Sequence, residues 1–170
     1  FENIRGIPAL VRWRNEIRQP GFLPVDPTLH WANPLKMEPP VAPFTPFPPG
    51  YTNANFPVPM VAHYHGLEVQ SGFDGIATEW FTPSPGQIVG PAFVSRDYLK
   101  PNEQPGTALF YHEHAMGMTR IGVYAGHVGT AYNIRDPDAP LDQPTSPLPK
   151  GPYEIPLVLR RGHLYATAAI

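Results

Sequence analysis

Proline accounts for 25 of the 170 residues and recurs along most of the chain. It lacks a backbone N–H and disrupts both helix interiors and central strands, so it excludes long regular elements. We therefore expect short strands joined by many ordered loops. A hydrophobic fraction of 42 % still suits a folded chain with a buried core. No apolar run approaches the roughly 20 residues of a membrane-spanning helix.

Five segments have the composition of short strands. Residues 9–15 (ALVRWRN) alternate apolar and polar side chains, as a strand with one buried face does. The other candidates are residues 58–65, 107–111, 129–135 and 153–159. Only residues 115–123 could form a short helix, and two internal glycines weaken that interpretation. Many short strands with almost no helix predict an all-β sandwich or barrel.

A proline-rich segment over residues 38–59 separates two of these strand candidates. The segment shows no periodicity, and the strands on either side look like parts of one sheet system. We therefore interpret it as a long surface loop rather than an interdomain linker. No internal repeat is present, so residues 1–156 are predicted to form one domain. Residues 157–170 are expected to begin a connection toward a second domain.

Charge and cysteine content exclude several classes of protein. The formal net charge is −2, from 12 basic and 14 acidic residues, so nothing favours binding to nucleic acid or an anionic membrane. Because the chain has no cysteine, it can form no disulfide, no zinc–thiolate site and no cysteine nucleophile.

Two His-x-His pairs hold four of the seven histidines: His63 and His65 in HYHG, and His112 and His114 in YHEH. In a strand, residues i and i+2 point to one face, roughly 6.5–7 Å apart. That spacing is long for two ligands of one ion but suits ligands of two neighbouring ions. One such pair is common by chance, whereas two on facing strands could hold a small metal cluster. The residues alone leave zinc, copper and iron open.

The sequence around both pairs resembles the first cupredoxin domain of multicopper oxidases. The matching stretches are VAHYHGLEVQSGFDG and LFYHEHAMGMTRIGVYAGHVGTAYNIRDP, and the nearest branch contains the bacterial laccases and spore-coat-type enzymes. The stretches RGIPALVRWRNEI, FLPVDPTLH, EWFT and GPYEIPLVL resemble further landmarks in the family's order. The resemblance covers nearly the whole chain except the proline-rich loop. It implies a cupredoxin-like Greek-key β-sandwich or barrel.

The resemblance also implies a role for each paired histidine in a three-copper cluster that reduces dioxygen to water. His63 would bind the type 2 copper. His65 and His112 would bind one copper of the type 3 pair, and His114 would bind the other. Asp74, in the FDG motif, matches an acidic residue near the type 2 copper, where it would deliver or orient protons or hydrogen-bond to bound water. The alternative for Asp74 is a plain turn residue.

Other polar and aromatic residues receive structural interpretations. Glu113 would point away from the face of its histidine neighbours, either supporting them from behind or facing solvent. The remaining histidines expected not to bind metal are His30, His127 and His163, and the tryptophans expected to pack in the core are Trp13, Trp31 and Trp80.

Only half of the family's ligand set is present. Such enzymes take four histidines from the first domain and four from the last, whose HCH motif supplies the cysteine of the type 1 copper. A phenolic or metal-ion reductant would therefore be oxidised outside this chain, in remaining cupredoxin domains of the same protein or of another subunit. We expect the domain to be incomplete at both ends, and the family favours an extracellular or cell-envelope location.

Two alternatives stay open at this point. One is a copper- or zinc-binding cupredoxin module without catalysis. The other is a β-sandwich whose histidines hold a single zinc ion.

Overall fold

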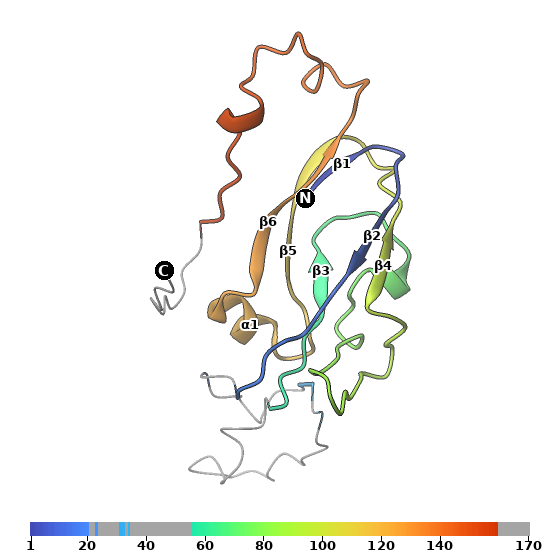
Figure 1. Cartoon of the computed structure of the whole chain (residues 1–170), viewed down its shortest axis with the longest axis vertical. Coiled ribbons are helices and arrows are strands. Elements are labelled where there is room, and N and C mark those ends of the chain that lie inside the picture. Colours follow the sequence, from blue (N-terminus) through green and yellow to red (C-terminus); the bar gives the residue numbers. More distant parts are fainter. Residues whose placement is uncertain (21–22, 24–30, 33, 35–55, 160–170) are drawn as a thin grey trace.

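A computed structural model describes residues 1–20, 23, 31–32, 34 and 56–159 (Figure 1). The strands in this part of the chain are β1 (Glu2–Ile4), β2 (Ala9–Arg12), β3 (Ala62–Tyr64), β4 (Asp97–Lys100), β5 (Thr107–Glu113) and β6 (Val128–Arg135). A short helix, α1 (Thr119–Ala125), connects β5 to β6. The fold is all-β and cupredoxin-like, which confirms the expected class.

The strands form two sheets. The larger sheet has the order β1-β6-β5-β3, and the smaller one pairs β2 with β4. β3 pairs with β5 and β5 pairs with β6 in antiparallel fashion, whereas β1 is parallel to β6. Within the described residues, β3 is therefore an edge strand whose only ladder partner is β5. In Figure 1 the β2–β4 pair lies beside β3, at the opposite end of the sheet from the helix and β6.

Aromatic side chains join the two sheets into one core. Trp13, which follows β2, packs on the rings of Tyr64 and Tyr111 at centroid distances of 5.8 and 5.6 Å. Tyr64 and Tyr132 are fully buried and meet edge to face at 4.6 Å. A second buried cluster contains Trp31, Trp80 and Tyr98. All three tryptophans are thus packing residues, as expected.

The structure corrects several of the expected elements. Residues 153–159 are not a strand: a 3-10 turn, Gly151–Tyr153, leads into an exposed segment without a ladder partner in the described chain. Proline at positions 152 and 156 removes two of the N–H groups that a ladder would need. The helix begins at Thr119 rather than at residue 115, after Gly117 adopts a φ of +70°. Strands β1 and β4 were not anticipated.

Other expectations fall partly or wholly outside the described residues. These are His30, His163, most of the proline-rich segment 38–59 and the connection beyond residue 159. The domain boundary at residue 156 stays a prediction. No helix in the described part of the chain is long and apolar enough to cross a membrane.

Candidate metal centre

The register of two neighbouring strands sets the positions of the paired histidines. β3 and β5 run antiparallel with His63 directly opposite His112. The ladder continues beyond the strand ends, since His65 N–H donates to Phe110 O and His114 N–H donates to Val61 O. Side chains alternate between the faces of a sheet, so all four imidazoles emerge on one face. The pairs therefore lie on adjacent strands of one sheet, not on facing strands as expected.

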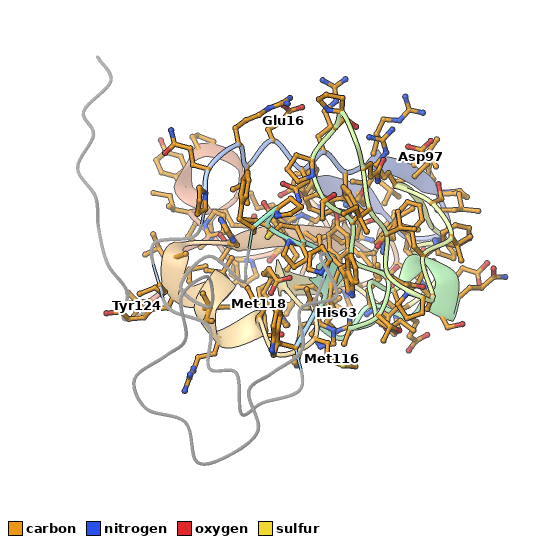
Figure 2. The ribbon with its side chains drawn as sticks, turned by 90° about the horizontal axis from the view of Figure 1, so that it is seen from below. Glu16, His63, Asp97, Met116, Met118 and Tyr124 are labelled. Carbon is orange, nitrogen blue, oxygen red and sulfur yellow. The ribbon has the colours of Figure 1, made fainter. Side chains whose placement is uncertain are left out.

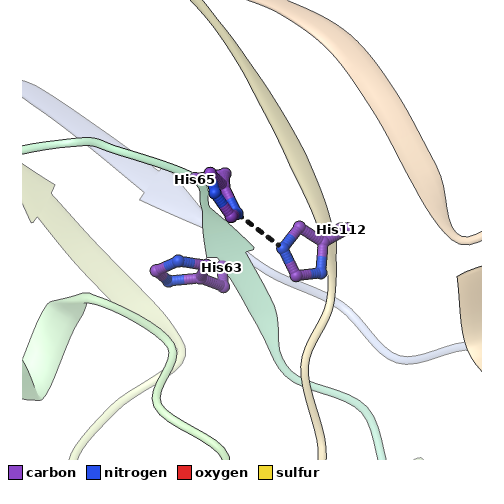
Figure 3. Close-up of side chains that lie close together, drawn as sticks. All are labelled: His63, His65 and His112. Carbon is purple, nitrogen blue, oxygen red and sulfur yellow. Dashed lines mark hydrogen bonds between the residues drawn. The ribbon is translucent and has the colours of Figure 1, made fainter. Parts of the chain in front are cut away.

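The four rings form one continuous cluster on this face. Figure 3 shows three of them, His63, His65 and His112, and Figure 2 labels His63 among the side chains of the chain. One ring nitrogen from each of His63, His65 and His112 lies within 4.8 Å of the others, a spacing compatible with metal binding. His114 stacks on His63 with the ring centroids 4.6 Å apart and contacts His112 at 5.4 Å. The structure thus brings together all four residues that the sequence singled out. Their roles as ligands stay a prediction.

Backbone carbonyls orient three of these rings. His63 Nδ1 lies 2.8 Å from Asp74 O, His112 Nδ1 lies 2.7 Å from Glu113 O, and His114 Nδ1 lies 3.2 Å from Gly75 O. A carbonyl oxygen only accepts, so each Nδ1 carries the proton and each Nε2 is left with a free lone pair. Metal-binding histidines commonly use their second ring nitrogen in this way.

His65 differs from the other three because its Nδ1, rather than its Nε2, points toward a neighbouring imidazole. Its Nδ1 lies 3.3 Å from His112 Nε2, the contact dashed in Figure 3. Two nitrogens bonded to one ion at about 2.0–2.1 Å with near-tetrahedral angles are about 3.3 Å apart. His65 and His112 therefore present the separation required of two ligands of the same ion. His65 is exposed and stacks on Phe110 at 4.7 Å.

Burial favours the neutral, metal-binding form of two histidines. It lowers the pKa of His112, an effect reinforced by the nearby rings of His63 and His65. The pKa of His114 is lowered in the same way, by burial first and then by its histidine neighbours. A metal ligand must have a free lone pair, so these shifts reduce the competition from protons near neutral pH. The all-imidazole donor set suits copper, and also zinc, iron or nickel.

Asp74 lies beside His63, as the motif predicts. Its Oδ1 is 3.3 Å from His63 Nδ1, on the side of the ring that faces away from Nε2. Its backbone carbonyl oxygen lies 2.8 Å from the same nitrogen. Asp74 also precedes a glycine with φ of +78°, so it is a turn residue as well. Its part in proton transfer stays a prediction.

Glu113 faces the opposite side of the sheet, as alternation requires, but it is not solvated. It is only 2 % exposed, and its Oε1 accepts from Ala115 N at 2.6 Å and from Val61 N at 3.4 Å. Burial raises its pKa to about 8. Glu113 thus supports the backbone at the ends of both histidine strands from behind. The solvent-facing interpretation was wrong because helix α1 covers this position at Gly122.

Two further residues near the cluster could not be recognised as part of the site from the sequence. Glu79 and Lys100 are both buried, and both hold the backbone segment that contains Asp74. Glu79 lies within the EWFT landmark, which the resemblance marks without a role. Lys100 lies at the end of β4, a strand that was not anticipated, and a lysine usually indicates a solvent-exposed position.

Comparison with known proteins finds laccases and multicopper oxidases similar to this chain. It is 36 % identical to a laccase of Bacillus subtilis (strain 168) over 149 residues, which are 88 % of this chain and 25 % of that protein. It is 37 % identical to a multicopper oxidase of Oryza sativa subsp. japonica over 85 % of this chain and 22 % of that protein. A laccase of Haloferax volcanii is 39 % identical over 66 % of the chain and 18 % of its own length. No protein-family model matches the sequence. The chain thus spans a quarter or less of these relatives.

Proposed function

We propose that this chain, which belongs to the multicopper oxidase family, supplies four histidine ligands to a three-copper cluster that reduces dioxygen to water. His63 binds the type 2 copper. His65 and His112 bind one copper of the type 3 pair, and His114 binds the other. A phenol or a reducing metal ion gives up its electrons at a type 1 copper held by other domains, of this protein or of a partner subunit.

One observation carries the proposal: four imidazoles converge on one sheet face. Three of them have their second nitrogen fixed by a carbonyl, and the fourth lies 3.3 Å from the Nε2 of a neighbour. A preorganised donor set of this kind lowers the cost of binding a metal.

Different residues of the chain have different roles at the site. Copper held there would supply the electron transfers that convert dioxygen to two waters. The carbonyls of Asp74 and Gly75 keep the Nε2 atoms of His63 and His114 directed outward. The Asp74 carboxylate, a quarter exposed beside His63, gives protons a route from solvent toward the cluster. A location in the cell envelope or outside the cell stays a prediction.

Copper content and oxygen uptake in the complete polypeptide that carries this sequence test the proposal. We expect close to three cluster coppers plus the type 1 copper, with oxygen consumed when a phenol is added. Replacing His63, His65, His112 or His114 singly by alanine should lower copper content and oxygen uptake together. Asn3→Ala, at the far edge of the sheet, serves as a control that leaves both unchanged. Alanine variants with unaltered copper content would contradict the proposal.

A further inference from the structure

Residues 73–76 form the segment whose carbonyls contact His63 and His114. This segment runs along the edge of β3 that does not pair with β5. At Gly75 it passes so close that a Cβ atom there would lie 2.1 Å from the carbonyl oxygen of Ala62 and 3.1 Å from His63 Cα. Gly75 also has a φ of +78°, which favours glycine. The segment thus sits directly against the strand that carries His63. Its carbonyls at Asp74 and Gly75 then reach His63 and His114.

Glu79 fixes this segment from the buried side. One carboxylate oxygen, Oε2, accepts hydrogen bonds from the backbone N–H groups of Gly75 and Ile76, each at 3.0 Å. Glu79 is 3 % exposed, so no solvent could easily replace these bonds. Gly75 thus donates its N–H to the Glu79 carboxylate, and its carbonyl oxygen accepts a hydrogen bond from His114. A shift of this peptide would move the histidine with it.

Lys100 fixes the same segment two residues before Gly75. Its ammonium nitrogen donates to Phe73 O at 2.5 Å and lies 4.4 and 4.8 Å from the ring centroids of Tyr64 and Tyr98. The side chain is fully buried, and burial lowers the pKa of Lys100 to about 8. Asp74 and Glu79 oppose that shift by favouring the charged form. A buried lysine is costly unless its charge is compensated, and here two carboxylates and two aromatic faces compensate it.

We propose that Glu79 and Lys100 are positioning residues of the metal centre, which hold residues 73–76 so that two carbonyls orient His63 and His114. The inference rests on the proposed copper-binding function. Neither side chain contacts an imidazole in the described structure. Each acts through the backbone: Glu79 through the N–H groups of Gly75 and Ile76, and Lys100 through the carbonyl of Phe73.

Three substitutions at Glu79 separate orientation from general packing. In Glu79→Gln the amide oxygen can accept both N–H groups, so copper affinity should stay within about threefold of the parent. Glu79→Asp withdraws the acceptor by one methylene, and Glu79→Ala removes it. We expect affinity for Cu(II) to fall in the order parent, Gln, Asp, Ala, with Ala lower by about 10–100-fold, the usual effect of losing support behind a ligand. Competition with a chelator measures the affinity in the complete polypeptide.

A second pair of variants tests the lysine. Lys100→Met keeps an unbranched chain but removes the donor, and Lys100→Arg keeps a charged donor. We expect Lys100→Met to lower Cu(II) affinity about tenfold and to change the electron paramagnetic resonance of the type 2 copper. Lys100→Arg should restore part of both. Tyr132→Phe is the matched control, because it removes a buried hydrogen bond to Asn102 without contacting residues 73–76. It should lower stability but leave copper affinity and the spectrum unchanged.

The outcomes separate this inference from the function on which it rests. If His63→Ala loses copper while Glu79→Ala and Lys100→Met bind it as tightly as Tyr132→Phe does, the positioning role is wrong and the ligand assignment stands. If His63→Ala itself keeps its copper, the proposed function fails first. Should Glu79→Ala not fold, the comparison of Glu79→Gln with Glu79→Asp decides the matter. Equal affinities and spectra for those two would overturn the inference.

Discussion

The two faces of the β3–β5 strand pair have opposite characters. One face carries the four paired histidines, which are exposed or half-buried. The other carries Tyr64, Tyr111 and Glu113, which pack against Trp13 and helix α1. The same alternation thus gives one face to the proposed ligands and the other to the core. It follows that substitutions on one face should affect copper, and those on the other the free energy of unfolding.

The two faces are also made rigid in different ways. On the core face, aromatic rings such as Tyr64 and Tyr132 fix one another by contact. On the histidine face, rings are held by hydrogen bonds to carbonyls of residues 74, 75 and 113. The positions of the rings on the histidine face therefore depend on backbone segments that Glu79, Lys100 and Glu113 anchor in the core.

The largest expected effect comes from the ligand face. His112→Ala removes a ring that contacts all three other imidazoles, as His63 also does. Copper affinity should fall by more than the roughly 10–100-fold cost of losing a residue behind a ligand. The unfolding free energy of the metal-free protein should change by only about 0.5 kcal/mol, because the ring is not part of the core. A large loss of metal-free stability would show that the two faces are not separable in this way.

Tyr64→Ala tests the core face on the neighbouring residue. The ring is fully buried against Trp13, Tyr111 and Tyr132, so its removal should cost about 3–5 kcal/mol of unfolding free energy. Denaturant melts of the metal-free protein measure this loss. A cost below about 1 kcal/mol would mean that the aromatic core contributes less than its burial indicates.

Gly122→Ala sharpens the comparison at the helix. Alanine normally stabilises a helix interior by about 0.8–1.0 kcal/mol relative to glycine. Here, however, a Cβ would lie 2.7 Å from Glu113 Cγ, so the overlap should outweigh that gain. We expect a net loss of about 1–3 kcal/mol, seen as a lower denaturation midpoint. As a control, a glycine-to-alanine change at Gly72 meets only the side chain of Val94, at 3.4 Å.

The last expected effect is a pH dependence from Glu113. Its pKa is raised from the ordinary 4.5 to about 8 by burial, so between these values the folded state binds a proton that the unfolded state has lost. Stability therefore falls as pH rises from 4.5 to 8 and is level in this respect above 8. Other ionisable groups also contribute to the dependence of stability on pH, so the useful quantity is a difference between two proteins.

Glu113→Gln supplies that difference. Its amide oxygen can still accept from Ala115 N, and it does not titrate. With a chelator present, the unfolding free energy of Glu113→Gln minus that of the parent should rise between pH 4.5 and 8. A difference that does not vary with pH would show that Glu113 is ionised in the folded protein. His127, which lines a 30 Å³ cavity with Glu113, is retained in both proteins.

The sequence was sufficient to predict the clustering of the paired histidines but not the residues that support them. His-x-His at strand spacing places two rings on one face whatever the details of the fold. The family resemblance implied that the two pairs meet, so the clustering of the four histidines was predictable. The anchoring of residues 73–76 was not, because it joins positions 27 residues apart in the chain through a buried lysine. Nothing local distinguishes Lys100 from a surface lysine. Its strand was also missed, since DYLK offers only four residues of alternation.

The errors in the elements have equally local causes. YEIPLVL in residues 153–159 has the composition of a strand, but strand formation depends on a partner that residue type does not specify. Glu113 was left between a supporting and a solvated role because the packing of α1 on β5 is a tertiary contact. Short strands were expected from the proline content, and the described strands span only three to eight residues.

Anomalous diffraction at the copper edge from crystals of the copper-loaded complete polypeptide tests the central claim most directly. The account predicts separate copper peaks bonded to His63 Nε2, to His114 Nε2, and to His65 Nδ1 together with His112 Nε2. A copper-loaded crystal with no copper peak beside the four histidines of β3 and β5 would contradict it. A single ion bound elsewhere within these 170 residues, in place of the cluster, would contradict it as well.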